Sequence, residues 1–175
     1  MWIAHKFAEK NNLKINLFGI DINPVAVDNA KILSNIGNFK ADIITHNNIT
    51  DKDGTPSFQN VLFDYVVWNM PQVPQNLKDS IVLNEIEPKA VKSQQQYWDS
   101  GVNGINALAR FSKNLPNILN SRGKALIWNS IPDSGIYVVK NTFKYYNFNV
   151  TSLDQHYSEK YKETTIIYEL THNLK

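Results

Sequence analysis

The sequence of 175 residues contains no cysteine, so it holds no disulfide, no thiolate metal site and no cysteine nucleophile. Its apolar runs are strand-sized and fall far short of the roughly 20 residues that a membrane-spanning helix needs. The N-terminus, Met1 to Lys10, lacks the apolar core of a secretory signal. These absences predict a cytoplasmic protein without a membrane partner.

An excess of charge of one sign is also missing. Lysine and arginine number 18 against 16 acidic residues, and the lysines are scattered rather than clustered. A dedicated nucleic-acid binder usually carries a basic stripe, so the composition permits such a partner without arguing for it. The histidines lack metal-ligand spacing, and no metal site is expected. They are His5, His46, His156 and His172.

A hydrophobic content of 42% and a charged content of 19% predict one globular domain spanning residues 1–175. Apolar periodicity predicts helices over 2–10, 24–37, 103–119 and 134–147, with a turn at 121–123. It predicts strands over 15–21, 41–46, 63–69, 124–129, 149–157 and 163–171. Helices alternating with strands, followed by a final strand pair, predict a three-layer α/β domain. Its sheet would be mostly parallel, with an antiparallel C-terminal strand pair.

Polar residues follow the predicted strands where each one ends. They are Asp21, the Asn47–Asn48 pair, Asn69 and Asn129. In an open parallel sheet, ligands bind outside the carboxyl ends of the strands. A carboxylate suits the two hydroxyls of a ribose, and an asparagine suits an adenine edge or an amide. Strands also end on polar residues simply because loops begin there, but several such positions at one edge favour a ligand site.

The segment Asn69-Met70-Pro71-Gln72 directly follows a strong strand. A proline-fixed turn holds its backbone carbonyls in one direction. Together with the asparagine oxygen, such a carbonyl gives two acceptors that can hold an NH2 group with its lone pair facing an electrophile. The alternative is an ordinary strand-ending turn.

Two stretches carry a resemblance to a known family. Residues 19–30, from Gly19-Ile20-Asp21 to Asn29-Ala30, resemble the second-strand signature of class I S-adenosylmethionine-dependent methyltransferases. Residues 64–72 resemble the fourth motif of that family, and the pattern from Gly101 to Ala125 is similar to its next helix and strand. The order and spacing are most similar to the release-factor glutamine methyltransferases.

This resemblance implies S-adenosylmethionine as cofactor and a methyl acceptor whose identity the sequence leaves open. It implies cofactor contacts from Asp21, Ile22, Asn47, Asn48 and Asn69, and catalytic positions at Asn69, Pro71 and Gln72. The implied reaction is in-line methyl transfer to an amino or amide nitrogen, of a protein glutamine or of a nucleobase. Trp98 and the neighbouring Asp99 are expected to bind the acceptor, whereas Trp68 and Trp128 are expected in the core.

The sequence departs from the family in two places. The fourth motif has Met70 in place of a proline and Gln72 in place of an aromatic residue, which leaves a small-molecule thioether as an alternative acceptor. The glycine-rich loop that should precede the helix over 2–10 is absent, and so is the first strand. We therefore expect a truncated chain, or one completed by another segment. An inactive interaction module of the same fold stays an alternative, and an acid after a strand also occurs in nicotinamide-dependent dehydrogenases.

Overall fold

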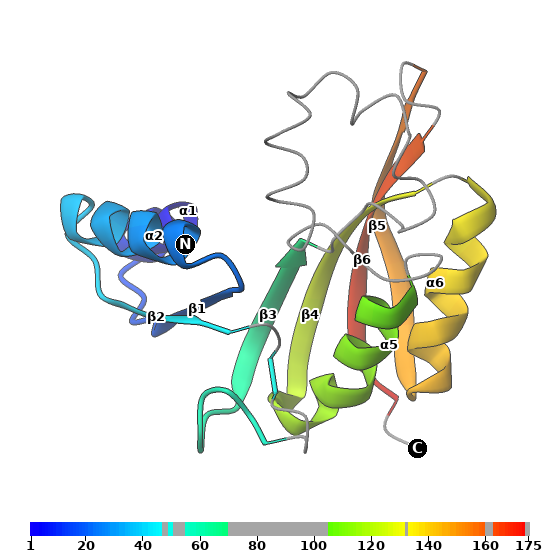
Figure 1. Ribbon diagram of the computed structural model, residues 1–175, viewed down its shortest axis with the longest axis horizontal. Coiled ribbons are helices and arrows are strands. Elements are labelled where there is room, and N and C mark those ends of the chain that lie inside the picture. Colours follow the sequence, from blue (N-terminus) through cyan, green and yellow to red (C-terminus); the bar gives the residue numbers. More distant parts are fainter. Residues whose placement is uncertain (47–48, 51–54, 70–104, 132, 160–162, 174–175) are drawn as a thin grey trace. The chain divides into compact units, whose positions relative to one another are not determined.

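The computed structural model describes residues 1–46, 49–50, 55–69, 105–131, 133–159 and 163–173 (Figure 1). These residues form two compact units, Met1–Ser57 and Phe58–Lys175, which we call the N-terminal and the C-terminal unit. Within the described ranges, no helix is long and apolar enough to cross a membrane. The extent of a single domain over 1–175 stays a prediction.

The described helices are α1 (Trp2–Lys10), α2 (Pro24–Ile36), α5 (Ile105–Asn114), the 3-10 helix η3 (Leu115–Asn117) and α6 (Asp133–Tyr145). The described strands are β1 (Leu17–Asp21), β2 (Ala41–Thr45), β3 (Phe63–Asn69), β4 (Leu119–Ile131), β5 (Phe148–Ser158) and β6 (Glu163–His172).

In the N-terminal unit, β1 and β2 form a parallel pair, with Leu17 opposite Ala41 and Asp21 opposite Thr45. Helix α2 contacts both strands and buries Val27. A parallel pair joined by a helix is the βαβ arrangement that the sequence predicts for this part of the chain. The two polar strand ends, at Asp21 and beyond Thr45, therefore lie at the same edge of this pair.

Helix α2 begins where local chemistry requires it. The Oδ1 atom of Asn23 accepts a hydrogen bond from the backbone N–H of Val25 at 3.0 Å, and Pro24 occupies the first turn. An asparagine cap satisfies a donor that the helix itself cannot satisfy, and proline is preorganised for the first helical position. The predicted start of this helix is confirmed.

The C-terminal unit contains a four-stranded sheet in the order β3-β4-β6-β5. Strand β3 runs parallel to β4, and β6 runs antiparallel to both β4 and β5. The predicted α/β class, with parallel strands and an antiparallel C-terminal strand pair, is confirmed.

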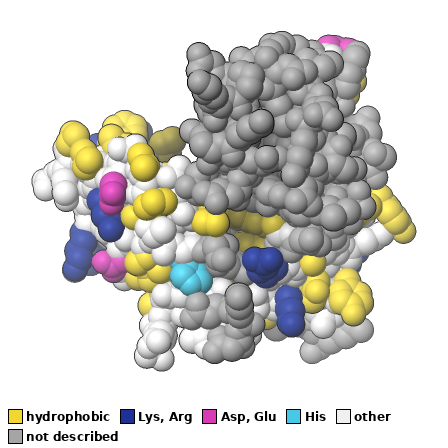
Figure 2. Space-filling view, in the orientation of Figure 1, with side chains coloured by type: hydrophobic (Ala, Val, Ile, Leu, Met, Phe, Trp, Pro, Cys, Tyr) yellow, Lys and Arg dark blue, Asp and Glu magenta, His cyan; other side chains and the backbone are white. Residues whose placement is uncertain are grey.

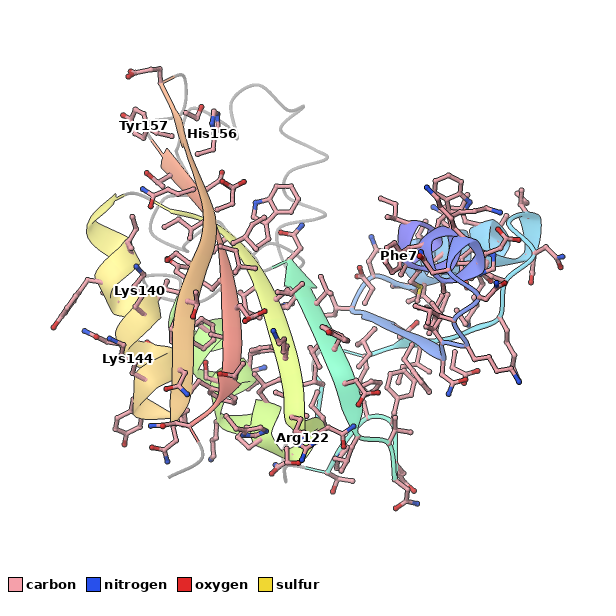
Figure 3. All side chains as sticks on the ribbon, turned by 180° about the vertical axis from the view of Figure 1, so that it is seen from behind. Phe7, Arg122, Lys140, Lys144, His156 and Tyr157 are labelled. Carbon is pink, nitrogen blue, oxygen red and sulfur yellow. The ribbon has the colours of Figure 1, made fainter. Side chains whose placement is uncertain are left out.

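Helices α5 and α6 lie on one face of this sheet, as Figures 1 and 3 show from opposite sides. The layer between helices and sheet contains mostly apolar side chains. Its fully buried members include Leu108, Phe111, Leu115, Ile127, Phe143, Ile166 and Leu170. Burying one such side chain contributes about 1.5–3 kcal/mol, so this layer is the main source of stability in the unit.

The opposite face of the sheet exposes large apolar side chains. Val67 is 75% exposed and Trp128 is 52% exposed, whereas Ile127 beside it is buried. Successive side chains of a strand point to opposite faces, so the residues that alternate with the core face outward. The prediction that Trp128 lies in the core is therefore wrong. Trp68 does face the helices and stacks on Phe111, with ring centroids 4.1 Å apart.

Strand β4 is longer than predicted. It begins at Leu119 and continues through residues 121–123, where a turn was expected. Its pairing with β3 slips between Phe63, opposite Leu119, and Tyr65, opposite Lys124. The extra residues of β4 are absorbed in this irregularity, as in a β-bulge. A Cβ atom on Gly123 would lie 2.8 Å from the carbonyl oxygen of Phe63, so glycine permits the close approach of the two backbones.

The predicted helix over 103–119 ends early. Helix α5 stops at Asn114, and Leu115–Asn117 form a 3-10 turn before β4 begins. Pro116 explains the difference, because its ring removes a backbone donor and disfavours the α conformation at the preceding residue.

Candidate functional site

Asp21 is the last residue of β1, and its side chain is exposed. The backbone N–H of Asn23 donates to its Oδ1 atom at 2.8 Å. This bond is part of the turn that leads into α2, so the turn fixes the carboxylate at the carboxyl end of the parallel pair. A carboxylate accepts several hydrogen bonds, and one backbone bond leaves it able to accept hydroxyl donors from a ligand.

Ile22 follows Asp21 in the same turn and is 40% exposed, so its apolar surface lies beside the carboxylate. An acid next to an exposed aliphatic side chain suits a ligand with a polar sugar and an apolar ring.

The neighbouring strand end adds two polar side chains. The backbone N–H of His46 donates to the carbonyl oxygen of Asp21 at 2.9 Å, which extends the β1–β2 ladder by one residue. Its Nδ1 atom lies 3.1 Å from the Oγ atom of Ser57. From the sequence, His46 was tested only for metal-ligand spacing, and no pattern pointed to Ser57 as its partner. Their separation of 11 positions has no helical or strand period that could have indicated the contact.

Within the described part of the chain, no group of three or more His, Cys, Asp or Glu side chains lies close enough to hold a metal ion.

Asn69 ends β3 in the C-terminal unit, where it lies opposite Trp128 of β4. Its side chain is exposed, so a polar group stands at the carboxyl end of a parallel strand, as predicted. Asp21 and Asn69 belong to different units. Their placement at one common edge stays a prediction.

The remaining predicted site residues lie outside the described residues. They are Asn47, Asn48, Pro71, Gln72, Trp98 and Asp99.

Asn129 was expected at the ligand-binding edge, but the structure buries it completely, at 0% exposure. It alternates with Trp128 and points toward the helices. Neither its Oδ1 nor its Nδ2 atom has a hydrogen-bond partner.

Two ionisable side chains of the C-terminal sheet differ in their surroundings. A hydrogen bond from the Nζ atom of Lys124 to Glu169, at 3.0 Å, raises the pKa of Lys124. Burial raises the pKa of Tyr168 to about 12, so its hydroxyl stays protonated and can donate a hydrogen bond throughout the neutral range.

Comparison with known proteins finds the fold but no close relative. No protein-family profile matches the sequence, and no curated protein matches it. Among solved structures, a methyltransferase from Pyrococcus furiosus is 12% identical, with a TM-score of 0.56. This match covers 97% of the present chain and 69% of that one. The PH0226 protein from Pyrococcus horikoshii OT3 is 16% identical, with a TM-score of 0.51 and coverage of 96% and 76%. The chain thus has a Rossmann-like fold that is found in a methyltransferase.

Proposed function

We propose that this protein is an S-adenosylmethionine-dependent methyltransferase that methylates an amino or amide nitrogen. The observation that carries the proposal is the exposed carboxylate of Asp21. It lies at the carboxyl end of a parallel strand, and the turn into α2 holds it in place. The overall fold supports the same reading, because it aligns over 97% of the chain with a protein named as a methyltransferase.

The residues around β1 fit the cofactor. A carboxylate that keeps acceptor capacity can bind both ribose hydroxyls of S-adenosylmethionine, and Ile22 offers apolar surface to its adenine. Asn47, Asn48 and Asn69 complete the proposed set of cofactor contacts. The cofactor supplies an electrophilic methyl group on a positively charged sulfur.

The protein's own contribution is to orient the acceptor. Asn69 offers a side-chain oxygen at the end of β3, and we assign the backbone carbonyl of Pro71 as a second acceptor, with Gln72 beside it. Two acceptors that hold an NH2 group direct its lone pair, and orientation of this kind can supply much of a rate enhancement. Trp98 and Asp99 are proposed to bind the rest of the acceptor.

The experiment is transfer of an isotopically labelled methyl group from S-adenosylmethionine. A glutamine-containing peptide, an adenine-containing oligonucleotide and methionine would represent the amide, the nucleobase amine and the thioether. We expect label on one nitrogen acceptor, and Asn69→Ala should lower the transfer rate by about 100-fold, the usual effect of losing one orienting hydrogen bond. Label on methionine alone would contradict methyl transfer to nitrogen and would indicate a thioether methyltransferase instead.

A second candidate function, an interaction module without activity, is favoured by one specific observation. Val25, Ile32 and Ile36 lie on one side of α2, and Ile36 is 77% exposed. Ile3 of α1 is also 78% exposed, and Figure 2 shows hydrophobic side chains on the surface of these helices. Exposed apolar patches often mark protein interfaces. Failure to bind S-adenosylmethionine, together with capture of a protein partner that Ile36→Lys abolishes, would favour this candidate.

A further inference from the structure

The buried polar side chains of the C-terminal unit include two that face the layer between its sheet and its helices. The carboxamide of Asn129 on β4 and the hydroxyl of Tyr168 on β6 belong to residues that are each 0% exposed. Neither carboxamide atom has a hydrogen-bond partner, and the Oη atom of Tyr168 has none. Leaving one buried donor or acceptor unsatisfied costs about 1–3 kcal/mol, so unpaired groups of this kind call for a physical explanation.

The sheet register places the two groups close together. Ile127 lies opposite Tyr168, and Asn129 lies opposite Ile166. Asn129 and Tyr168 are therefore diagonal neighbours on the same face, about 7–8 Å apart at the backbone and within reach of long side chains. We call these two residues, which lie on the same face of neighbouring strands, the polar patch.

Helix α6 packs against the Tyr168 side of this patch. The ring of Phe143 lies 6.4 Å from the ring of Tyr168, and the Nζ atom of Lys140 lies 6.0 Å from the centre of the same ring. Figure 3 labels Lys140 on the helix beside the strands. Lys140 therefore interacts with the face of the ring. The Tyr168 hydroxyl has no partner among the described residues and remains able to donate a hydrogen bond.

The hydrogen-bonding inventory of the patch specifies a ligand chemistry. Asn129 offers donors and an acceptor, and Tyr168 offers a donor, because burial raises the pKa of its hydroxyl to about 12. A primary amide matches this set. Its carbonyl oxygen can accept from both residues while its NH2 group donates to the Oδ1 atom of Asn129. A carboxylate would lack that donor, and moving its charge from water into this apolar layer would cost free energy.

We propose that Asn129 and Tyr168 form a buried binding site for an uncharged amide group between the sheet and α6. The site lies entirely in the C-terminal unit. It does not depend on methyl transfer or on Asp21, so the two proposals can fail separately.

Acetamide is the probe that tests this site, with acetate as the charged isostere and acetone as a ligand that only accepts hydrogen bonds. In 15N-labelled protein, acetamide should shift the side-chain NH2 signals of Asn129 saturably and should raise the melting temperature. Acetate and acetone should do neither.

Asn129→Leu should abolish both responses. It should fold at least as stably as the wild type, because it replaces an unpaired buried amide by an apolar group of similar size. Tyr168→Phe should weaken acetamide binding about fivefold to tenfold, as expected for one lost neutral hydrogen bond. Asn120→Ala is the matched control, because the Asn120 amide is already bonded to Asp64, and it should respond as the wild type does.

Three results would overturn the proposal. The first is an equal acetamide response in the wild type and Asn129→Leu. The second is the absence of saturable shifts at Asn129. The third is a long-lived water contacting the Asn129 amide that acetamide does not displace, which would make the patch an internal water site.

Discussion

The hydroxyl of Tyr168 links burial to pH dependence. Its pKa is raised to about 12 from the ordinary 10.0, because the folded protein keeps the group away from water. Between these two values the unfolded chain loses its proton while the folded protein keeps it. Stability is therefore full below about pH 10 and falls, by on the order of 2 kcal/mol, as the pH rises toward about 12.

Urea unfolding between pH 9 and pH 12, values chosen to bracket the ordinary tyrosine pKa of about 10, measures this loss. Tyr168→Phe should remove this part of the pH dependence. Tyr145→Phe should leave it in place, since Tyr145 is largely exposed. A wild type and a Tyr168→Phe variant with parallel pH profiles would contradict the assignment.

Single residues also show where sequence reasoning was limited. Asp21 and Asn69 were correctly expected at strand ends, because the apolar run before each residue marks the end of its strand. The outward position of Trp128 and the burial of Asn129 depend on which face of β4 the helices cover. Distant elements decide that face, and the apolar strand sequence does not encode it locally.

Among the elements, helix boundaries with local causes were predictable. Helix α2 starts at the asparagine cap and proline that the sequence displays, and α1 matches its predicted range. Strand β4 was less predictable because residues 121–123 have turn chemistry. Non-local pairing decides their conformation, since β6 pairs with β4 from Lys124 to Ile131 and β3 pairs with it from Leu119.

The start of α2 gives a direct test of cap energetics. Asn23→Ala removes the acceptor for the Val25 N–H and should lower the free energy of unfolding by about 1 kcal/mol. Asn29→Ala, in the exposed middle of the same helix, should leave stability unchanged or raise it slightly, because alanine is the better helix former. Denaturant unfolding of both variants checks the prediction. Equal effects at the two positions would mean that the cap contributes nothing.

The irregular pairing of β3 and β4 gives a second test. In Gly123→Ala, the new Cβ atom would lie 2.8 Å from the Phe63 carbonyl oxygen, and a backbone atom cannot move away cheaply. We expect a loss of about 1–3 kcal/mol. The exposed Ser121→Ala should change stability by no more than about 0.5 kcal/mol. A Gly123→Ala variant as stable as the wild type would show that the two strands separate easily here.

At the scale of the molecule, the helices α5 and α6 of the C-terminal unit lie on one face of its sheet. Val67→Lys places a charge on the outward face, where the side chain is 75% exposed, and should change stability by less than about 1 kcal/mol. Val66→Lys, one residue away on the helix side, should cost about 2 kcal/mol or more, because Val66 is half-buried and a lysine there would bring its charge next to apolar side chains. Thermal unfolding of the two variants checks this prediction. Equal losses of stability would mean that the outward face of the sheet is also buried against other residues.

The central claim of the proposed function is that the chain binds an S-adenosyl compound through Asp21. Calorimetric titration with S-adenosylhomocysteine tests this claim most directly. Asp21→Asn keeps the side-chain acceptor for the Asn23 N–H and removes the charge. The matched control is Asp42→Asn, because Asp42 is exposed on the adjacent strand β2.

We predict measurable binding by the wild type and by Asp42→Asn. Binding by Asp21→Asn should be about 10- to 100-fold weaker, the usual effect of losing hydrogen bonds to a charged group. Equal affinities for all three proteins, or no binding by any of them, would contradict the account.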